Sequence, residues 1–227
     1  MSNKSHFFRQ SINKSLVFYD RFNNANINEI DSLTATSSIS YQIRNNGTTG
    51  IFNGSTFVQY PSEDYFNFSN KPFSIGGYFK STNIGSTQMI VIKRDLGSND
   101  EFQLALVSSK LDLILFDDIN GGNIRVNSNV LNSNLDYSFC ITYDGSGSEL
   151  GLNIYINGVL NVSQRIKTGA YVSVKETSSP VIFGRRPNGS LSFIGNVDSL
   201  FIFNYVIDSL QIADINTKVL NNNDIRW

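Results

Sequence analysis

The sequence predicts an all-β protein in which two antiparallel sheets pack face to face, followed by one short helix near the C-terminus. From Leu16 onward, short apolar or alternating segments are separated by clusters of Gly, Asn, Asp and Ser, the pattern of a β-sandwich. No helical pattern of about 10 to 15 residues alternates with these segments, which excludes parallel βαβ units. With 227 residues, 40% of them hydrophobic, the chain is long enough for one large sandwich.

The expected strands are separated by recognisable turns. In chain order they are SLVFYDRF, GIFNG, TFVQY, FSIGGYFK, QMIVIKR, EFQLALVS, KLDLILFD, DYSFCITYD, LGLNIYING, VLNVSQRI, PVIFGRR and FIGNVDSLFIFN. Asn157 and Gly158 lie between two alternating segments and predict a type I′ hairpin, because both positions of that turn need a positive φ. The Gly-rich segment 144–151 also reverses the chain. We therefore expect a three-strand meander from Ser138 to Arg165.

The stretch FIGNVDSLFIFNYVIDSLQIADI, residues 193–215, changes its pattern from strand to helix. Its alternation places Val197, Ser199, Phe201 and Phe203 on one face and Asp198, Leu200 and Ile202 on the other. Both faces become apolar toward the end of the strand, as in a central strand covered on both sides. Asp208 and Gln211 have the spacing of a capping box, which predicts a short helix. We expect this helix to close an open end of the sandwich.

Beyond the sandwich, the sequence predicts residues 1–14 as a flexible arm, 15–220 as a single domain and 221–227 as a tail. The N-terminus lacks the apolar core of a signal peptide, and no segment reaches the about 18 apolar residues of a membrane span. We therefore expect cytoplasmic synthesis without membrane insertion. The net charge of −1 provides no basic surface for nucleic acid. The single cysteine, Cys140, lies in an apolar strand and is expected to be buried.

Four groups of segments, taken in order, resemble a known family. They are SLVFYDRF; GIFNGSTFVQYP followed by KPFSIGGYFK; DYSFCITYDGS with LNIYINGVL; and VIFGRR with FIGNVDSLFIFNYVIDSLQIADI. Together they resemble the laminin-G-like and pentraxin-like branch of the concanavalin A-like lectin/glucanase superfamily, from about Leu16 to Leu220. The resemblance implies a two-sheet jelly roll of about twelve to fourteen strands, found in lectins, adhesive modules, glycosidase appendages and virion proteins, so that the fold alone does not give the function.

The carboxylates do not have the spacing of a glycosidase. Catalytic members of the fold carry two acids at alternate positions of one strand, so that both face the same side. The pairs Glu63–Asp64 and Asp117–Asp118 are adjacent, and neighbours on a strand point to opposite faces. We expect both pairs to be solvated turn residues. His6, in the arm, is the only histidine, so a triad is not expected, and a glycoside-active enzyme of the same fold is the least favoured alternative.

No cofactor is expected, although calcium is possible. The weak candidate ligands are Asp95, Asp100, Asp117, Asp118 and Asp144, which lie in acidic loops. Turn formation by Asx side chains also explains each of them. Where pentraxin-like relatives carry acidic calcium ligands, this chain has Arg185 and Arg186, whose charge opposes calcium binding.

Candidate ligand-binding residues combine aromatic rings with planar polar groups near predicted loops, as a sugar-binding surface requires. They are Tyr60, Tyr65, Phe66, Tyr171, Arg185, Arg186 and Asn188. The alternative is that these aromatics cover sheet edges and that the arginines pair with acids.

These observations predict a non-catalytic recognition or structural module. We expect it to be displayed on a larger assembly such as a phage virion, as a head decoration, fibre or tail component, and to bind glycans or a protein surface. Residues 1–14 would then dock to an assembly partner, since terminal arms become ordered only when tied down. The expected location is a virion or an extracellular surface. The alternative is a free-standing, carbohydrate-binding adhesion protein of the lectin type.

Overall fold

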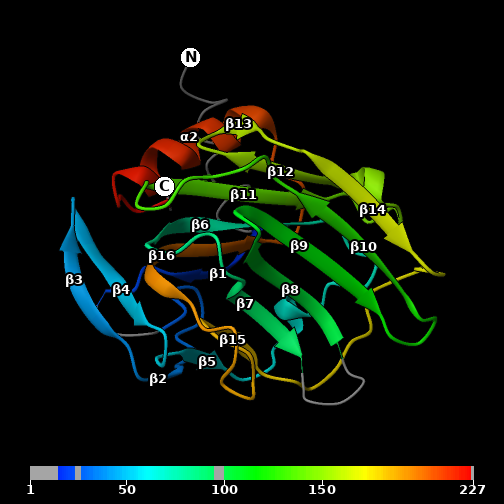
Figure 1. The fold of residues 1–227 in the computed structure, drawn as a ribbon, viewed down its shortest axis with the longest axis horizontal. Helices are drawn as coiled ribbons and strands as arrows, with labels where there is room; N and C mark the ends of the chain where they lie inside the picture. The colour runs from blue at the N-terminus through cyan, green and yellow to red at the C-terminus, as the bar shows by residue number, and fades with distance from the viewer. Residues whose placement is uncertain (1–14, 24–26, 95–99, 226–227) are drawn as a thin grey trace.

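The protein is a sandwich of two antiparallel sheets (Figure 1) in a computed structural model that describes residues 15–23, 27–94 and 100–225. The first sheet has the order β13 (Val159–Leu160), β12 (Leu152–Ile156), β11 (Tyr137–Tyr143), β6 (Phe73–Ser81), β16 (Ile194–Phe203), β4 (Gly47–Asn53) and β3 (Ser40–Arg44), and β1 (Leu16–Asp20) also pairs with β16. The second has the order β14 (Gln164–Thr168), β10 (Gly122–Asn127), β9 (Lys110–Asp117), β8 (Asp100–Val107), β7 (Gln88–Arg94), β15 (Val181–Phe183), β5 (Val58–Tyr60) and β2 (Thr36–Ser37). Two 3₁₀ turns, η1 (Asp64–Phe66) and η2 (Glu149–Gly151), and the helix α2 (Ser209–Leu220) complete the described elements. The predicted fold class is confirmed.

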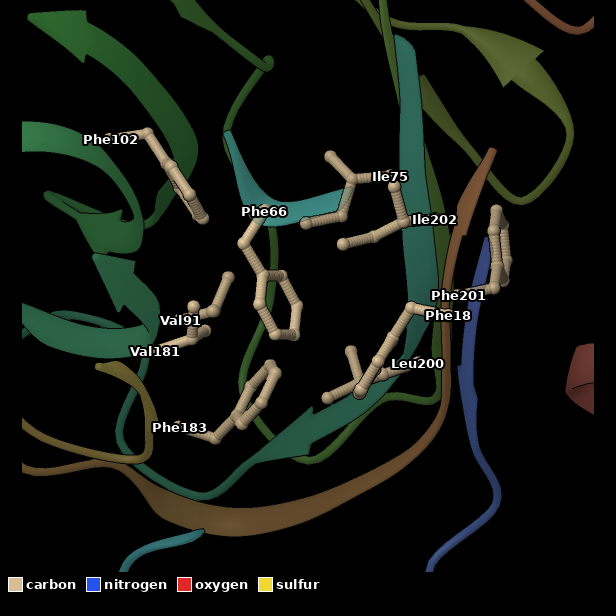
Figure 2. A pocket seen from close by; sticks show the side chains of 10 residues that line it. All are labelled: Phe18, Phe66, Ile75, Val91, Phe102, Val181, Phe183, Leu200, Phe201 and Ile202. Atoms are coloured by element: carbon tan, nitrogen blue, oxygen red, sulfur yellow. The ribbon is translucent and has the colours of Figure 1, made fainter. Parts of the chain in front are cut away.

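The main core lies between the two sheets, where aromatic and branched side chains meet (Figure 2). Phe18, Ile75, Leu200 and Ile202 of the first sheet face Val91, Phe102, Val181 and Phe183 of the second, and Phe66 of η1 lies between them. The gap among these side chains has a volume of about 10 Å³, which is barely enough for one water. It is a packing gap and not a ligand site.

A β-bulge in β16 changes the predicted alternation of this strand. The pairing register with β6 shifts between Asp198 and Phe201, and Ser199 has a φ of 51°. The bulge inserts an extra residue and reverses the faces that follow. Val197 therefore shares the main core with Leu200 and lies on the opposite face from Phe201. The predicted grouping was wrong on this point, whereas the burial of both faces of a central strand is confirmed.

Helix α2 covers the outer face of the first sheet (Figure 1). The prediction that this helix closes an open end of the sandwich was wrong. The predicted capping box is confirmed, because the Asp208 side chain accepts from the Gln211 backbone and the Gln211 side chain accepts from the Asp208 backbone. The buried side of the helix presents Ile212 and Ile215 to the sheet. Cys140 lies in the same apolar cluster and is a free, buried cysteine, as predicted.

Arg44 links the C-terminal end of α2 to the first sheet by hydrogen bonds. Its guanidinium donates to the carbonyl oxygens of Val219 and Leu220, each at 2.8 Å, and to the carboxylate of Asp198 at 2.8 Å and 3.1 Å. It also lies 3.8 Å from the centre of the Tyr78 ring. Burial raises the pKa of Asp198 to about 6, against the opposing effect of Arg44. The last carbonyl groups of the helix, which have no partner within it, are satisfied in this way.

The predicted meander is shorter than expected. Asn157 and Gly158 have φ values of 51° and 78°, as a type I′ turn requires. The strand after this turn, β13, contains only two residues in the first sheet, and the chain then crosses to the second sheet as β14. The strands β2 and β3 were not predicted, because the segment 36–44 is polar and mostly exposed.

The C-terminal segment packs against the sandwich within the described residues. Asn222 donates to the carbonyl oxygens of Arg44 and Thr48, and Ile225 is buried in the cluster beneath α2. Within the described part of the chain, no helix is long and apolar enough to cross a membrane.

Candidate ligand-binding face

Three of the predicted ligand-binding residues lie inside the core. Tyr60 is fully buried, and its hydroxyl donates to Asp20 at 2.7 Å. Tyr171 is only 3% exposed and belongs to the core cluster. Phe66 is also fully buried. None of these three rings offers a face to a ligand in this structure, because the same apolar character that suggests a binding platform is used here for packing.

Tyr65 lies at one end of the sandwich beside a small cavity. The ring packs in an edge-on arrangement against Phe66, and its hydroxyl accepts from Asn28 at 3.2 Å. The cavity has a volume of about 60 Å³, and Asn67, Lys71 and Tyr65 are among its lining residues. This space corresponds to roughly two water molecules, far below the about 300 Å³ or more of ligand pockets.

The loop between β15 and β16, residues 184–193, carries the remaining three predicted residues. Asn188 accepts from the backbone and hydroxyl of Ser190 at 3.1 Å and 2.7 Å, so its side chain holds the turn of the loop. The Arg186 backbone N–H donates to the Ser190 carbonyl at 3.0 Å. Arg185 lies over Phe57, with its guanidinium 3.8 Å from the ring centre. This loop is therefore an ordered hairpin whose arginines lie on either side of β15.

The same loop covers part of the outer face of the second sheet. Leu191 packs over a small apolar cluster formed by Met89, Ile92, Ala105 and Ile182 on β7, β8 and β15. The Leu191 carbonyl accepts from the Met89 backbone at 2.8 Å. The loop therefore closes the outer face above β7 and β15, and the outward side chains of β8, β9 and β10 lie beyond it.

These outward side chains form what we call the open face: Gln103, Ile114, Phe116, Asn123 and Arg125. The register aligns Gln103 with Ile114 and Ile114 with Arg125, while Phe116 pairs with Asn123. Side chains alternate between faces along a strand, so these residues point away from the buried Leu113, Leu115 and Ile124. The open face thus combines a half-buried aromatic ring with three planar polar groups.

An ion pair and an unpartnered amide characterise the open face. Arg125 Nε donates to Asp112 Oδ1 at 2.9 Å, and Arg125 Nη2 contacts Asp112 Oδ2, which makes the pair bidentate. The guanidinium is 30% exposed, whereas the carboxylate is 1% exposed. Burial raises the pKa of Asp112, against the opposing effect of Arg125. Gln103 is 8% exposed, and its side-chain oxygen has no hydrogen-bond partner.

A second charged group lies where β7 ends and β8 begins. Arg94 Nε lies 2.6 Å from Asp100 Oδ1, and the Asp100 backbone N–H donates to Asp118 at 2.6 Å. Burial and the neighbouring Arg94 guanidinium both lower the pKa of Arg186, while Asp100 raises it. The buried Arg186 Nε has no hydrogen-bond partner. This arginine therefore has unused hydrogen-bonding capacity near the edge of the sheet.

The candidate calcium ligands serve other purposes. Asp117 is 1% exposed, so the expectation of a solvated turn residue was wrong: its carboxylate accepts from the backbones of Asn120, Val172 and Ser173, and these bonds lower its pKa. Asp144 forms a turn by accepting from Ser146 at 2.9 Å. Asp95 lies outside the described residues. Among the residues that are described, no three His, Cys, Asp or Glu side chains gather into a metal site.

A family model described as the concanavalin A-like lectin/glucanases superfamily matches residues 52–213. The chain belongs to this superfamily. The resemblance inferred from the sequence is thereby confirmed. A search of curated proteins finds no match.

Three solved structures with a similar fold are parts of toxins. The binding domain of Paraclostridial Mosquitocidal Protein 1 is 16% identical over 90% of this chain and 52% of its own, with a TM-score of 0.72. The receptor-binding domain of botulinum neurotoxin C/D mosaic serotype is 16% identical over 91% and 52%, with a TM-score of 0.69. A structure of botulinum neurotoxin type C, whose cell entry depends on two ganglioside molecules, is 16% identical over 92% and 52%, with a TM-score of 0.67. This chain spans about half the length of each structure, and these low identities show the fold alone.

Proposed function

We infer that residues 15–220 act as a non-catalytic recognition domain that binds glycans through the open face. The arrangement of Phe116 beside Gln103 and Arg125 supports this proposal. An aromatic ring offers an apolar surface for the C–H side of a sugar, and planar amide and guanidinium groups exchange directional hydrogen bonds with sugar hydroxyls. The partly exposed Arg125 guanidinium, held by the buried Asp112 carboxylate and followed along the same face by the half-buried Phe116 ring, is the single observation that carries the proposal.

The family and the similar structures support binding over other roles. The superfamily includes lectins, and the similar toxin domains are binding domains by their own descriptions, one of them linked to ganglioside-dependent entry. Those activities belong to proteins about twice as long as the matched region. They support a recognition role and do not identify the sugar.

The acids of the open face are not arranged for glycoside hydrolysis. That reaction needs a proton donor and a second free carboxylate about 5 to 9.5 Å apart. Asp112 is engaged by two nitrogen atoms of Arg125, and Asp100 lies against Arg94. The chemistry available on this face is therefore hydrogen bonding and stacking.

A protein surface is the alternative ligand of the same face. Display on a virion, with residues 1–14 docking to an assembly partner, stays a prediction from the sequence because those residues lie outside the described part of the chain.

A glycan array followed by calorimetry with each hit tests the proposal. We expect Phe116→Ala to weaken binding about fivefold or more, since the stacking of nucleobases on aromatic rings, a comparable contact, is worth about 1 to 3 kcal/mol. Tyr41→Ala is a matched control, because Tyr41 is another half-buried aromatic residue but lies on β3 of the other sheet. An array without any bound saccharide, or equal loss of affinity in both variants, would contradict the proposal and favour a protein ligand.

A further inference from the structure

A lysine, a glutamate and an asparagine meet near the end of β7 and the start of β8. The side chains of Lys93 and Glu101 are both fully buried. Lys93 Nζ lies 2.8 Å from Glu101 Oε1 and donates to Glu101 Oε2 at 3.0 Å. The same nitrogen also donates to the side-chain amide oxygen of Asn67, which follows η1, and to the Thr177 carbonyl at 3.0 Å.

The neighbours of Lys93 and Glu101 bury the amine and the carboxylate and hold the carboxylate in place. Phe102 pairs with Lys93 across the strands and packs against Phe68, with ring centres 4.8 Å apart. Both rings are almost completely buried. Glu101 accepts from the Thr177 backbone at 2.7 Å and from its hydroxyl at 2.5 Å. The buried amine and acid are thus held in place, with the half-buried Asn67 amide in contact with the amine.

We propose that Lys93 and Asn67 form an intramolecular isopeptide bond with the assistance of Glu101. Transfer of one proton from the ammonium to the carboxylate removes both charges from the interior and gives a free amine next to a carboxylic acid. The amine nitrogen attacks Cγ of Asn67, the Nζ–Cγ bond forms, and the bond from Cγ to the amide nitrogen breaks. Glu101 relays the proton from the attacking to the leaving nitrogen and ends unchanged. The products are a secondary amide and ammonia, so that neither an oxidant nor a cofactor is needed.

The geometry supplies what this otherwise slow reaction requires. Lys93 Nζ already contacts the Asn67 oxygen, so the carbonyl carbon lies one bond beyond that contact. Holding two reacting groups in contact replaces a bimolecular encounter with a unimolecular step. Burial raises the pKa of Glu101, against the hydrogen bonds from Lys93 and Thr177. A raised pKa favours the protonated acid, which is the form that can act as a proton donor.

The bond would join two segments that are 26 residues apart in the sequence. It would tie the loop after η1 to the central part of the second sheet. A covalent link of this kind removes conformations from the unfolded chain, as a disulfide does. It needs no oxidising environment, which suits a chain whose only cysteine is unpaired and buried.

Mass spectrometry of the purified full chain tests the proposal directly. We expect the intact protein to be lighter than its sequence by one ammonia, and digestion to yield a branched peptide in which the Lys93 side chain joins the segment around Asn67. Asn67→Ala and Glu101→Gln should both restore the sequence mass. Asn70→Ala is the matched control, because Asn70 is an exposed asparagine of the same loop, and it should keep the loss of ammonia.

Two results would overturn the proposal. The first is a wild-type mass equal to the sequence mass with linear peptides alone. The second is a loss of ammonia without the branched peptide, since succinimide formation at an Asn–Gly step such as Asn157–Gly158 gives the same mass change and is hydrolysed in mild base to aspartate and isoaspartate. If a variant does not fold, the peptide map of the wild-type protein still decides the question.

Discussion

The two sheets differ in how much of their outer faces other segments of the chain cover. The first sheet carries an apolar outer face, and α2 covers it with Ile212 and Ile215. The second sheet is covered above β7 and β15 by the loop that carries Leu191, whereas β8 to β10 present Phe116 and Arg125 outward. In Figure 1, α2 lies beside the strands of the first sheet, away from β7, β8 and β9.

This difference separates stability from recognition within one fold. A covered apolar face stabilises the protein by removing hydrocarbon surface from water. An open face with polar groups contributes little to stability and keeps hydrogen-bonding capacity for a ligand. Substitutions on the covered face should therefore change unfolding, and substitutions on the open face should change binding.

Arg44→Ala should be the most destabilising change on the covered face. It removes the partner of a buried carboxylate, Asp198, and two bonds to the end of α2. Loss of one member of a buried ion pair costs about 3 to 5 kcal/mol. Urea unfolding at pH 8 should show this loss. Lys218→Ala, which breaks an ion pair with the exposed Asp214 one turn away on α2, should cost about 0.5 kcal/mol or less.

The cost of Arg44→Ala should also depend on pH. The folded-state pKa of Asp198, about 6, lies above its ordinary value, so its contribution to stability is fully present below about pH 4 and declines as the pH rises through 6. Without Arg44 the pKa rises further and the decline continues to higher pH. The difference between the two proteins should therefore be larger at pH 8 than at pH 5. A difference that is constant across this range would contradict a buried, unpaired Asp198.

Ile215→Ala should lower the free energy of unfolding by about 2 to 4 kcal/mol, because the side chain is 2% exposed beneath α2 and its loss leaves a cavity. Leu210→Ala is the control on the same helix. Leu210 is 78% exposed, so its truncation should change stability by less than about 0.5 kcal/mol. Equal effects would contradict the packing of α2 against the outer face of the first sheet.

Local signals in the sequence predicted some features and not others. The turn at Asn157 and the capping box at Asp208 depend on residues close in sequence, and both are present. The bulge at Ser199 has no such signal, because a serine in the sequence does not indicate a positive φ. The face to which α2 packs depends on contacts between distant strands, so the sequence predicted the helix but not its position.

The candidate site illustrates the same limit. Tyr60 and Tyr171 were chosen for their chemistry, and the fold places both in the core. Gln103 was missed because apolar residues flank it in the sequence, and Phe116 was missed because it ends the apolar run 113–116. Alternation within EFQLALVS and KLDLILFD assigns these residues to the outward face, but only the pairing of β8 with β9 shows that they share one surface.

Gln103→Leu should have the smallest effect on stability and a clear effect on binding. Its amide oxygen has no partner, and Ile92 and Ile114 flank it across the strands, so an apolar side chain of similar size should change the unfolding free energy by less than about 1 kcal/mol. Gln88→Leu is the matched control in the same sheet. Gln88 is 2% exposed and accepts from the Ile194 backbone at 2.8 Å, so this change should cost about 1 to 3 kcal/mol. If Gln103→Leu also costs more than 2 kcal/mol in denaturant unfolding, the amide stabilises the fold, and Gln103 would not belong to the binding surface.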